Sequence, residues 1–516
     1  MSKDWIGNSK AVYSILGASN HSKEDREQND YYATSPIAVE KLLERESFSK
    51  DILEPCCGGG HISEVLKAHG YNVESSDLID RGYGEVKDIF DIDSNKKDII
   101  TNPPYKCFDV ETQCYTKRGW LSYNEIQFDD EVLSINPNTL SIEWTNIKQI
   151  IIRNIEPTEK MYHFSTDKMD IMVTSGHRMF AFSRFNEQIV KQNNDLIHSE
   201  HIRSYHYLPR EGYSWFGQDK DSFVLPAMNG KCHAQPCYKK EIIINMDDWL
   251  RFFGMWLADG YCRHTKNSKN NDRKTVGIKQ DRLRKEEIET ILNALPFNYK
   301  EYEDNNRATP CINFEIHNEQ LWNYLIQFGY SDTKYIPSEI KELSTRQLQL
   351  LIDSYFKGDG SIYRDIGRTY RTISPYLAED IQEILLKLGY LSHITKRSYK
   401  TKDNIKTLYC INHAPQSKYS RVYFPSNKQD GCLCDYAGKV WCLTLIKNGV
   451  FLLRRNGKEF ICGNCAQEVV EHALDISKDG CKVAMLLKIQ FLESKKRRKL
   501  FEKYPPPNTC TCLVSV

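Results

Sequence analysis

The chain of 516 residues lacks three features that would each define a class of protein: a long apolar run, an apolar N-terminal segment, and an excess of charge of one sign. No hydrophobic stretch approaches the roughly 20 residues that a membrane helix needs, and the first ten residues, MSKDWIGNSK, are polar. Lysine and arginine number 70 against 69 acidic residues, so the net charge is +1. We therefore expect a cytoplasmic protein that is neither secreted nor bound to a membrane. Its overall charge does not favour a polyanion as partner.

The sequence has 17 cysteines but few of them are closely paired, and the one Cys-x-x-Cys is Cys462 to Cys465. Without an export signal, cysteines are expected to stay reduced. Cys232 and Cys237 bracket the sequence CHAQPC, but no second pair stands at the spacing of a zinc finger. We expect free thiols rather than a structural zinc site.

The pattern of predicted elements changes several times along the chain. Residues 50–106 alternate apolar strands with an amphipathic helix, which is typical of a parallel α/β sheet. Residues 107–240 are rich in short alternating strands, 247–400 mix helices and strands, and 439–461 are again strand-like. From residue 465 the α/β pattern of the first segment returns. This nested order indicates domains inserted within one another rather than placed in series.

A glycine-rich turn, an acid and an Asn-Pro-Pro-Tyr sequence follow three successive predicted strands. The turn EPCCGGGHIS opens a helix, where glycines let a cofactor approach the backbone. An acid at the end of the next strand can accept hydrogen bonds from ribose hydroxyls. An asparagine and a proline-held carbonyl can accept bonds from an exocyclic amine, and a tyrosine can stack on a flipped base. The candidate cofactor-binding residues are Glu54, Gly58, Gly60 and Asp77, and the candidate catalytic residues are Asn102, Pro103, Pro104 and Tyr105.

Together these motifs resemble the S-adenosylmethionine-dependent amino-methyltransferases that act on adenine N6 in DNA. The resemblance covers residues 30–106 and 465–505 and implies a split Rossmann-like α/β methyltransferase with S-adenosylmethionine as its cofactor. The flanks 1–106 and 465–516 total 158 residues, which is short for this family, so we expect a truncated or frame-altered domain. The alternative is a nucleotide-binding α/β domain with a chance Asn-Pro-Pro turn.

The α/β pattern is interrupted directly after NPPYK. Joining Lys106 to Cys465 would give NPPYKCAQEVVEHAL, a continuous strand, loop and helix. The interruption contains CFDVETQCYTKRGW, MVTSGHRM and KVWCLTLIKNGVFLLRRNGKEFICGN, which resemble the sequence blocks of inteins. The resemblance implies an all-β Hint splicing domain in two parts, 107–240 and 426–464. That domain would excise residues 107–464 without a cofactor.

The residue at the upstream junction, Cys107, suits the first step of splicing. A thiolate is a strong nucleophile near neutral pH and can convert the preceding amide into a thioester. The resemblance assigns Thr174 to distorting or polarising the scissile bond and His177 to protonating the departing nitrogen.

The downstream junction supplies the later steps by the same resemblance. Cys465 would accept the acyl group, and Asn464 would cyclise and release the insertion. Two positions depart from the family's pattern: Gly463 stands where the penultimate histidine is usual, and Cys442 stands where an aspartate is usual. We interpret Cys442 as an auxiliary acid/base or a nearby thiol. With Gly463 in place of the histidine, another residue must assist asparagine cyclisation, or this step is slower than in other members of the family.

Two similar segments lie about a hundred residues apart, DDWLRFFGMWLADGYCR at 247–263 and QLQLLIDSYFKGDGSIY at 347–363. Each predicts an apolar helix that ends in Asp-Gly. Small residues four apart on one face would let the two helices pack backbone to backbone; they are Gly254, Ala258, Ser354 and Gly358. The packing would bring Asp259 and Asp359 together. Because two adjacent carboxylates need a cation, we expect Mg²⁺ and a metal-bound water that attacks a phosphodiester.

This pair of helices resembles the LAGLIDADG homing endonucleases. The resemblance implies an α+β domain with pseudo two-fold symmetry over residues 241–425, which binds double-stranded DNA with β-ribbons in the major groove. Lys334 in KYIPSEI is then a candidate to stabilise charge or position water, and basic stretches at 266–274 and 279–285 either contact phosphates or form a solvated face. The alternative for the two helices is ordinary core packing with incidental Asp-Gly caps.

The sequence is thus interpreted as a multidomain, monomeric precursor: a methyltransferase host, an insertion that splices itself out, and a DNA endonuclease within that insertion. A different interpretation is a splicing-defective chain that acts only as a site-specific DNA endonuclease. A third is a chain that only binds DNA.

Overall fold

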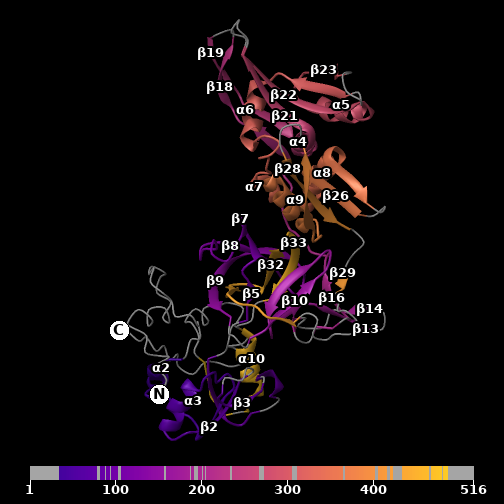
Figure 1. Cartoon of the computed structure of the whole chain (residues 1–516). Coiled ribbons are helices and arrows are strands. Elements are labelled where there is room, and N and C mark those ends of the chain that lie inside the picture. Colours follow the sequence, from indigo (N-terminus) through magenta and orange to yellow (C-terminus); the bar gives the residue numbers. More distant parts are fainter. Residues whose placement is uncertain are drawn as a thin grey trace.

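The computed structural model describes residues 34–77, 82–87, 89–92, 95–102, 106–155, 159–185, 188–190, 196–199, 202–203, 205–232, 235–266, 272–304, 311–363, 367–400, 405–414, 419–421, 433–463, 467–478 and 480–485. These residues form three units that follow one another from the bottom to the top of Figure 1. We name them the flank unit (34–102 and 467–485), the strand unit (106–214 and 419–463) and the two-helix unit (215–414). In the described part of the chain, no helix has the length and apolar character to cross a membrane.

The flank unit joins the two ends of the chain in one parallel sheet of order β3-β2-β1-β4-β34. The strands are β1 (Asp51–Glu54), β2 (Asn72–Asp77), β3 (Glu85–Val86), β4 (Asp98–Thr101) and β34 (Val483–Met485), and the helices are α2 (Pro36–Leu43), α3 (His61–Ala68), η1 (Ile89–Asp91) and α10 (Gln467–Ile476). Side chains alternate between the two faces. Ile52 and Ile100 pack with α2 and α3, whereas Leu53 and Ile99 pack with α10. The sheet therefore includes segments that the whole insertion separates in sequence.

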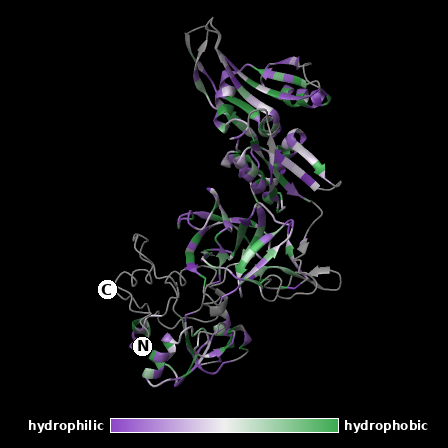
Figure 2. Ribbon diagram, viewed as in Figure 1, coloured by the Kyte–Doolittle hydropathy of each residue, from purple (hydrophilic) through white to green (hydrophobic). Residues whose placement is uncertain are grey.

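The strand unit contains no α-helix among its described residues. Its first part comprises β5 (Phe108–Asp109), β6 (Gln113–Thr116), β7 (Gly119–Leu121), β8 (Glu131–Ile135), β9 (Ile142–Asn154), β10 (Met161–Ser165), β11 (Asp170–Thr174), β12 (Arg178–Phe180), β13 (Phe182–Phe185), β14 (Gln188–Val190), β15 (Leu196–His198) and β16 (His206–Pro209). Its second part comprises β29 (Tyr419–Arg421), β30 (Leu433–Cys434), β31 (Lys439–Leu445), β32 (Val450–Arg455) and β33 (Lys458–Gly463). The two parts interleave, because β31 pairs with both β5 and β9, and β33 pairs with β12. Figure 2 shows hydrophobic residues along these strands, where the core of the unit lies.

The two-helix unit repeats one arrangement twice. Helix α4 (Met246–Asp259) is followed by β21 (Gly260–Lys266), β22 (Asp272–Asp281), η3 (Arg282–Arg284), α5 (Lys285–Asn293), β23 (Tyr299–Asp304), β24 (Cys311–Ile316), α6 (Glu319–Leu325) and η4 (Ile326–Phe328). Helix α7 (Ser338–Lys341) leads into α8 (Thr345–Asp359), which is followed by β25 (Gly360–Tyr363), β26 (Gly367–Thr372), α9 (Pro375–Lys387), β27 (His393–Lys400) and β28 (Ile405–His413). The strands pair in the orders β21-β22-β24-β23 and β25-β26-β28-β27. This equivalence is the pseudo two-fold symmetry expected from the repeat.

The two-helix unit begins earlier than the boundary at residue 240 that the sequence suggested. Strand β17 (Ser222–Leu225) pairs with β20 (Ile242–Asn245), and β18 (Met228–Cys232) pairs with β19 (Gln235–Lys239). Leu225 lies in the same apolar cluster as α4 and α8. Short alternating strands resemble those of the strand unit in sequence, so only this packing reveals where they belong. Cys237 also differs from expectation, because it is disulfide-bonded rather than a free thiol.

Candidate functional sites

The upstream junction lies against the strand that ends at Thr174. The backbone N–H of Cys107 donates to Thr174 Oγ1 at 2.9 Å, and the backbone N–H of Thr174 donates to the Cys107 carbonyl at 2.9 Å. Strand pairing continues from there, since Phe108 stands opposite Val173. Cys107 and Thr174 are both fully buried. The Thr174 hydroxyl therefore accepts a hydrogen bond from the amide nitrogen of the Lys106–Cys107 bond.

A tight turn from Thr174 to His177 closes over the same junction. The N–H of His177 donates to the Thr174 carbonyl at 3.1 Å, and Gly176 has φ of +74°, a left-handed conformation that suits glycine. A Cβ at Gly176 would lie 3.0 Å from Lys106 Cε, so the Lys106 side chain crosses this turn. The His177 ring meets Phe108 edge-on at a centroid distance of 4.4 Å. His177 therefore contacts Phe108, the residue that directly follows Cys107.

The strand that leads to the downstream junction lies beside the residues that follow the same turn. Strand β33 ends at Gly463, and its Cys462 stands opposite Met179 of β12, two residues after His177. The Cys462 thiol donates to the Arg178 carbonyl at 3.4 Å. Asn464 and Cys465 lie outside the described residues. The described parts of both junctions therefore meet around the turn at 174–177.

Gly463, which stands where the family's histidine is usual, is closely surrounded. A Cβ at this position would lie 3.0 Å from Leu196 Cδ2 and 3.1 Å from the Arg178 carbonyl oxygen. A larger side chain would have to displace Leu196.

Cys442 lies on β31, next to the upstream junction. It is 1% exposed, and the register pairs its neighbour Trp441 with Phe108. Cys442 and Cys107 therefore stand at the same level of adjacent strands.

In the two-helix unit, α4 and α8 touch through their small residues, as the spacing predicts. A Cβ at Gly254 would lie 2.4 Å from the Leu351 carbonyl oxygen. The Ser354 hydroxyl donates to the Arg251 carbonyl at 2.5 Å. A Cβ at Gly358 would lie 2.4 Å from the Ala258 Cβ and 2.6 Å from Asp259 Oδ2. The helices are therefore packed backbone to backbone, with an aspartate at the end of each.

The two aspartates share a partly desolvated site. Burial raises the pKa of Asp359 to about 7, and the charge of Asp259 adds to the increase. Burial also raises the pKa of Asp259, although a hydrogen bond from Gln280 lowers it. Two such carboxylates fit an oxygen-preferring divalent cation such as Mg²⁺, which would offset their repulsion. No group of three or more metal-ligating His, Cys, Asp or Glu side chains occurs among the described residues, so water or phosphate would complete the coordination.

Gln280 was not found from the sequence, because only the fold brings the end of β22 to the end of α4. Lys334, the candidate to stabilise charge or to position water, has its donors engaged by backbone carbonyls. Its ammonium donates to the carbonyls of Trp256, Leu257 and Gly260 at 2.7, 3.0 and 2.7 Å. An ammonium has three donors, so none remains to position water. Lys334 instead holds the C-terminal end of α4 and acts on the two aspartates only through its charge.

Burial lowers the pKa of Lys334 to about 8, against the opposing influence of Asp359 and Asp259. The charge of the Lys334 ammonium therefore depends on the ionised carboxylates of Asp359 and Asp259.

In the flank unit, the expected cofactor residues lie at the carboxyl ends of β1 and β2. In parallel sheets this edge is where ligands bind. Asp77 accepts from the Gly58 N–H at 2.9 Å, and the Ser63 hydroxyl donates to Glu54. Burial raises the pKa of Glu54 to about 8. Gly60 has φ of +82° and lies under the Tyr83 ring.

Asn102 follows β4 at the same edge, and its side-chain amide donates to Thr34 Oγ1 at 3.3 Å. Pro103, Pro104 and Tyr105 lie outside the described residues. Asn102, the described residue of the Asn-Pro-Pro-Tyr motif, therefore contacts the segment just before α2.

Residues 346–422, which begin in α8 and extend over the second half of the two-helix unit, match the family described as a LAGLIDADG-like domain. The chain thus contains a LAGLIDADG-like domain.

Curated relatives match longer stretches. The chain is 27% identical over 305 residues to an ATP-dependent Clp protease proteolytic subunit of Chlamydomonas moewusii, covering 56% of this chain and 28% of that protein. It is 24% identical over 419 residues to a DNA-directed RNA polymerase subunit beta C-terminal section of Stigeoclonium helveticum, which covers 69% of this chain and 36% of that protein. The chain therefore spans about a third of the length of these relatives.

Similar solved structures include the homing endonuclease I-DmoI in complex with DNA and Mn, with a TM-score of 0.26, 13% identity, and coverage of 34% of this chain and 92% of that one. They also include a bacterial intein-like domain from Clostridium thermocellum, with a TM-score of 0.17, 11% identity, and coverage of 27% and 77%.

Proposed function

We propose that the chain is a self-splicing precursor in which residues 107–464 are an intein that excises itself and joins Lys106 to Cys465. The observation that carries the proposal is the meeting of both junction strands at the turn that bears Thr174 and His177. Two kinds of support accompany it. The flanks form one sheet across the insertion, and the two relatives named above share long segments with this chain although their names denote unrelated proteins.

The first step uses the contacts at the upstream junction. The Cys107 thiolate attacks the Lys106 carbonyl carbon, the amide C–N bond breaks, and the freed nitrogen takes a proton. Thr174 holds that nitrogen before the bond breaks, and His177 is assigned as the proton donor. The thioester stays attached to the chain through Cys107 Sγ.

The remaining steps join the flanks. The Cys465 thiolate attacks the thioester, which moves the acyl group to Cys465 and returns a thiol to Cys107. The Asn464 side-chain nitrogen then attacks its own carbonyl and breaks the Asn464–Cys465 bond. The free amine of Cys465 finally takes the acyl group from its own sulfur. Every bond broken is matched by one formed, and no cofactor takes part.

Peptide mapping of the purified product tests the splice itself. A fragment that contains Lys106 followed directly by Cys465 is expected. A preparation in which every fragment that contains Cys107 is still joined to Lys106 contradicts the proposal.

We also propose that the two-helix unit hydrolyses DNA at specific sites with Mg²⁺ held by Asp259 and Asp359. The chemistry that the cation supplies is activation of water and neutralisation of phosphate charge. The carboxylate pair is the supporting observation. Double-stranded DNA that carries the uninterrupted host sequence across codons 106 and 465 is the substrate to test. Cutting by the parent and its loss in Asp359→Asn are expected, and equal cutting by both contradicts the assignment.

The flank unit is proposed as the remainder of an S-adenosylmethionine-dependent DNA amino-methyltransferase. The cytoplasm is the proposed compartment of the whole chain. Glu54, Gly58, Gly60 and Asp77 would hold the cofactor at the sheet edge. Equilibrium binding of S-adenosylmethionine to the joined flanks tests this, with Asp77→Ala as the weakened variant.

A second candidate follows from Gly463, which stands in place of the family's histidine and where a side chain would press on Leu196 and the Arg178 carbonyl. If asparagine cyclisation fails for that reason, the chain acts only as a DNA endonuclease. Accumulation of the full-length chain with intact DNA cutting would favour this candidate.

A further inference from the structure

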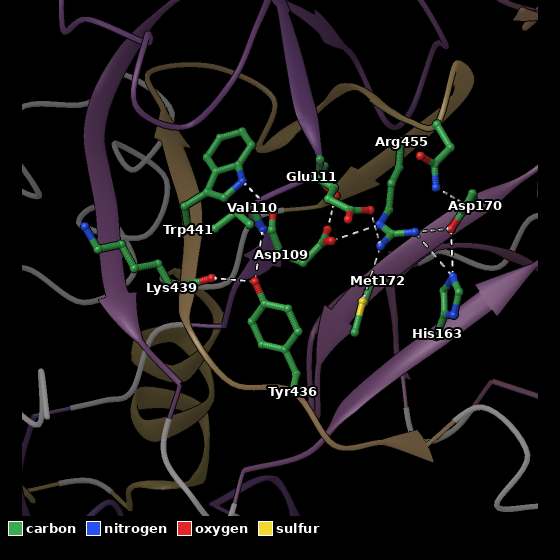
Figure 3. A network of polar contacts seen from close by, with 12 residues as sticks. Asp109, Val110, Glu111, His163, Asp170, Met172, Tyr436, Lys439, Trp441 and Arg455 are labelled. Carbon is green, nitrogen blue, oxygen red and sulfur yellow. Dashed lines mark hydrogen bonds and ion pairs between the residues drawn. The ribbon is translucent and has the colours of Figure 1, made fainter. Parts of the chain in front are cut away.

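A buried guanidinium connects the strands that surround the upstream junction (Figure 3). Arg455 Nε donates to Asp109 Oδ2 at 2.9 Å, Nη1 to Asp170 Oδ1 at 2.8 Å, and Nη2 to Glu111 Oε2 at 2.7 Å. The Arg455, Asp109 and Asp170 side chains are 8%, 1% and 8% exposed. Charge-assisted bonds of this kind are stronger than neutral ones and fix geometry as well.

The three elements joined here are the ones that carry the junction. Asp109 is two residues beyond Cys107 on β5, and Asp170 is at the start of β11, whose last residue is Thr174. Arg455 is the last residue of β32, directly before the turn that leads into β33 and Gly463. The Arg455 side chain therefore connects β5, which follows Cys107, to β11, which ends at Thr174.

Strand β5 is short, and the Asp109 side chain adds to the contacts that its backbone and the buried Phe108 ring make. It is two residues long, and its ladder contacts are limited to Val173 on one side and to Val440 and Trp441 on the other. Trp441 Nε1 donates to the Asp109 carbonyl at 2.8 Å. The side chain of Asp109 is held by Arg455 and by the Thr112 hydroxyl, at 2.5 Å. Loss of the guanidinium would leave two buried carboxylates facing one another, which drives their strands apart.

Asp170 is itself fixed from two further directions. His163 Nε2 is 2.8 Å from Asp170 Oδ1, and the Asn456 amide donates to Asp170 Oδ2 at 2.9 Å. Burial acts to raise the pKa of Asp170, but these hydrogen bonds and the Arg455 charge lower it to about 2. The carboxylate is therefore ionised throughout the physiological range and is a permanent partner for the guanidinium.

We infer that Arg455 is a positioning residue for the first step of splicing: by joining Asp109 to Asp170 it holds the Lys106–Cys107 bond at Thr174. This inference rests on the proposed self-splicing function. Arg455 touches neither junction bond, so its effect reaches Cys107 through β5 and β11.

The neighbouring residue provides a matched control. Arg454 precedes Arg455 on β32, and consecutive residues of a strand point to opposite faces. Arg454 donates to Gln113 Oε1 at 2.8 Å and to Glu379 Oε1 of α9 at 2.9 Å, on the side of the two-helix unit. It is an arginine of similar burial that contacts neither Asp109 nor Asp170 in the described structure.

The test separates the two junctions. In a parent chain with Asn464→Ala and Cys465→Ala, only the upstream thioester can form, and added thiol releases residues 1–106 at a measurable rate. In a second parent with Cys107→Ala, only the Asn464–Cys465 bond can break. We expect Arg455→Met to slow upstream release at least tenfold while downstream cleavage stays within about twofold of its parent. Arg454→Met should leave upstream release within about twofold.

Arg455→Lys keeps the buried charge and tests the inference if Arg455→Met does not fold. An ammonium lacks the planar, forked donors with which a guanidinium binds two carboxylates at once. We therefore expect upstream release in Arg455→Lys to be at least threefold slower than in the parent. Where Arg455→Met folds, the rate of Arg455→Lys should lie between those of the parent and of Arg455→Met. An unchanged rate in Arg455→Lys, or equal slowing of both junctions in Arg455→Met, would overturn the inference. Failure of the first parent itself to release any fragment would instead refute the proposed splicing function.

Discussion

The affinity of the metal-free chain for Mg²⁺ should fall about tenfold for each pH unit below 7, because Asp359 must lose a proton before it binds a cation. Burial, aided by the charge of Asp259, places the pKa of Asp359 at about 7 rather than 3.8. At pH 5 about 1% of the folded molecules would carry the ionised group, so binding should be about 100-fold weaker than at pH 8. A carboxyl of ordinary pKa would leave the affinity unchanged over this range.

Titration calorimetry measures both the affinity for Mg²⁺ and the number of protons that binding releases. At pH 6, in two buffers of different ionisation enthalpy, binding of one Mg²⁺ should release about 0.9 of a proton. Asp353→Asn on the same helix is the control, since that side chain is 45% exposed and pairs with Arg368. An affinity independent of pH between 5 and 8, with no proton released, would refute the account of this site.

The same shift has a consequence for stability without metal. A carboxyl whose pKa is raised in the folded state contributes stability that is fully present below about pH 4 and is lost as the pH rises through 7. The difference of about three pKa units corresponds to at most about 4 kcal/mol. Asp359→Asn should therefore raise the melting temperature of the two-helix unit at pH 8, with little change at pH 4, and Mg²⁺ should stabilise the parent but not the variant.

Three further predictions concern the packing and the junctions. Gly254→Leu should lower the free energy of unfolding by about 1–3 kcal/mol and abolish DNA cutting, because its side chain would meet the Leu351 carbonyl. Thermal melting and a DNA-cutting assay measure the two effects. An unchanged melting temperature would contradict the packing of α4 on α8. Thr174→Val should slow thiol-induced upstream release about tenfold, the equivalent of one hydrogen bond of about 1.4 kcal/mol, whereas Thr174→Ser should retain the parental rate. Gly463→His should not accelerate downstream cleavage alone but should do so with Leu196→Ala, which makes room for the ring; acceleration by the single change would contradict the crowding described here.

Local patterns predicted the features that local sequence determines. The apolar helices, their small residues and their Asp-Gly ends place Asp259 and Asp359 together, because spacing along a helix fixes which face a residue occupies. The alternation of strands and helices in the flanks likewise predicted a parallel sheet. The position of β17 and β20 could not be predicted, since a short alternating strand has the same pattern in either unit.

Residues that act across the fold left no signal of this kind. Lys334 matched a family motif, yet the three carbonyls that use its donors come from residues 256, 257 and 260. Arg455 stands in an ordinary strand sequence, and its carboxylate partners are more than 280 residues away. The crowding at Gly463 depends on Leu196 and Arg178. Each of these contacts requires the tertiary structure.

The mass of the intact products after expression tests the central claim most directly. The account predicts two new species, one of 358 residues and one of 158 residues that runs from Lys106 directly into Cys465, with only the 516-residue chain in a Cys107→Ala, Asn464→Ala control. A parent that yields the 516-residue chain alone, under conditions in which the control does the same, would contradict it.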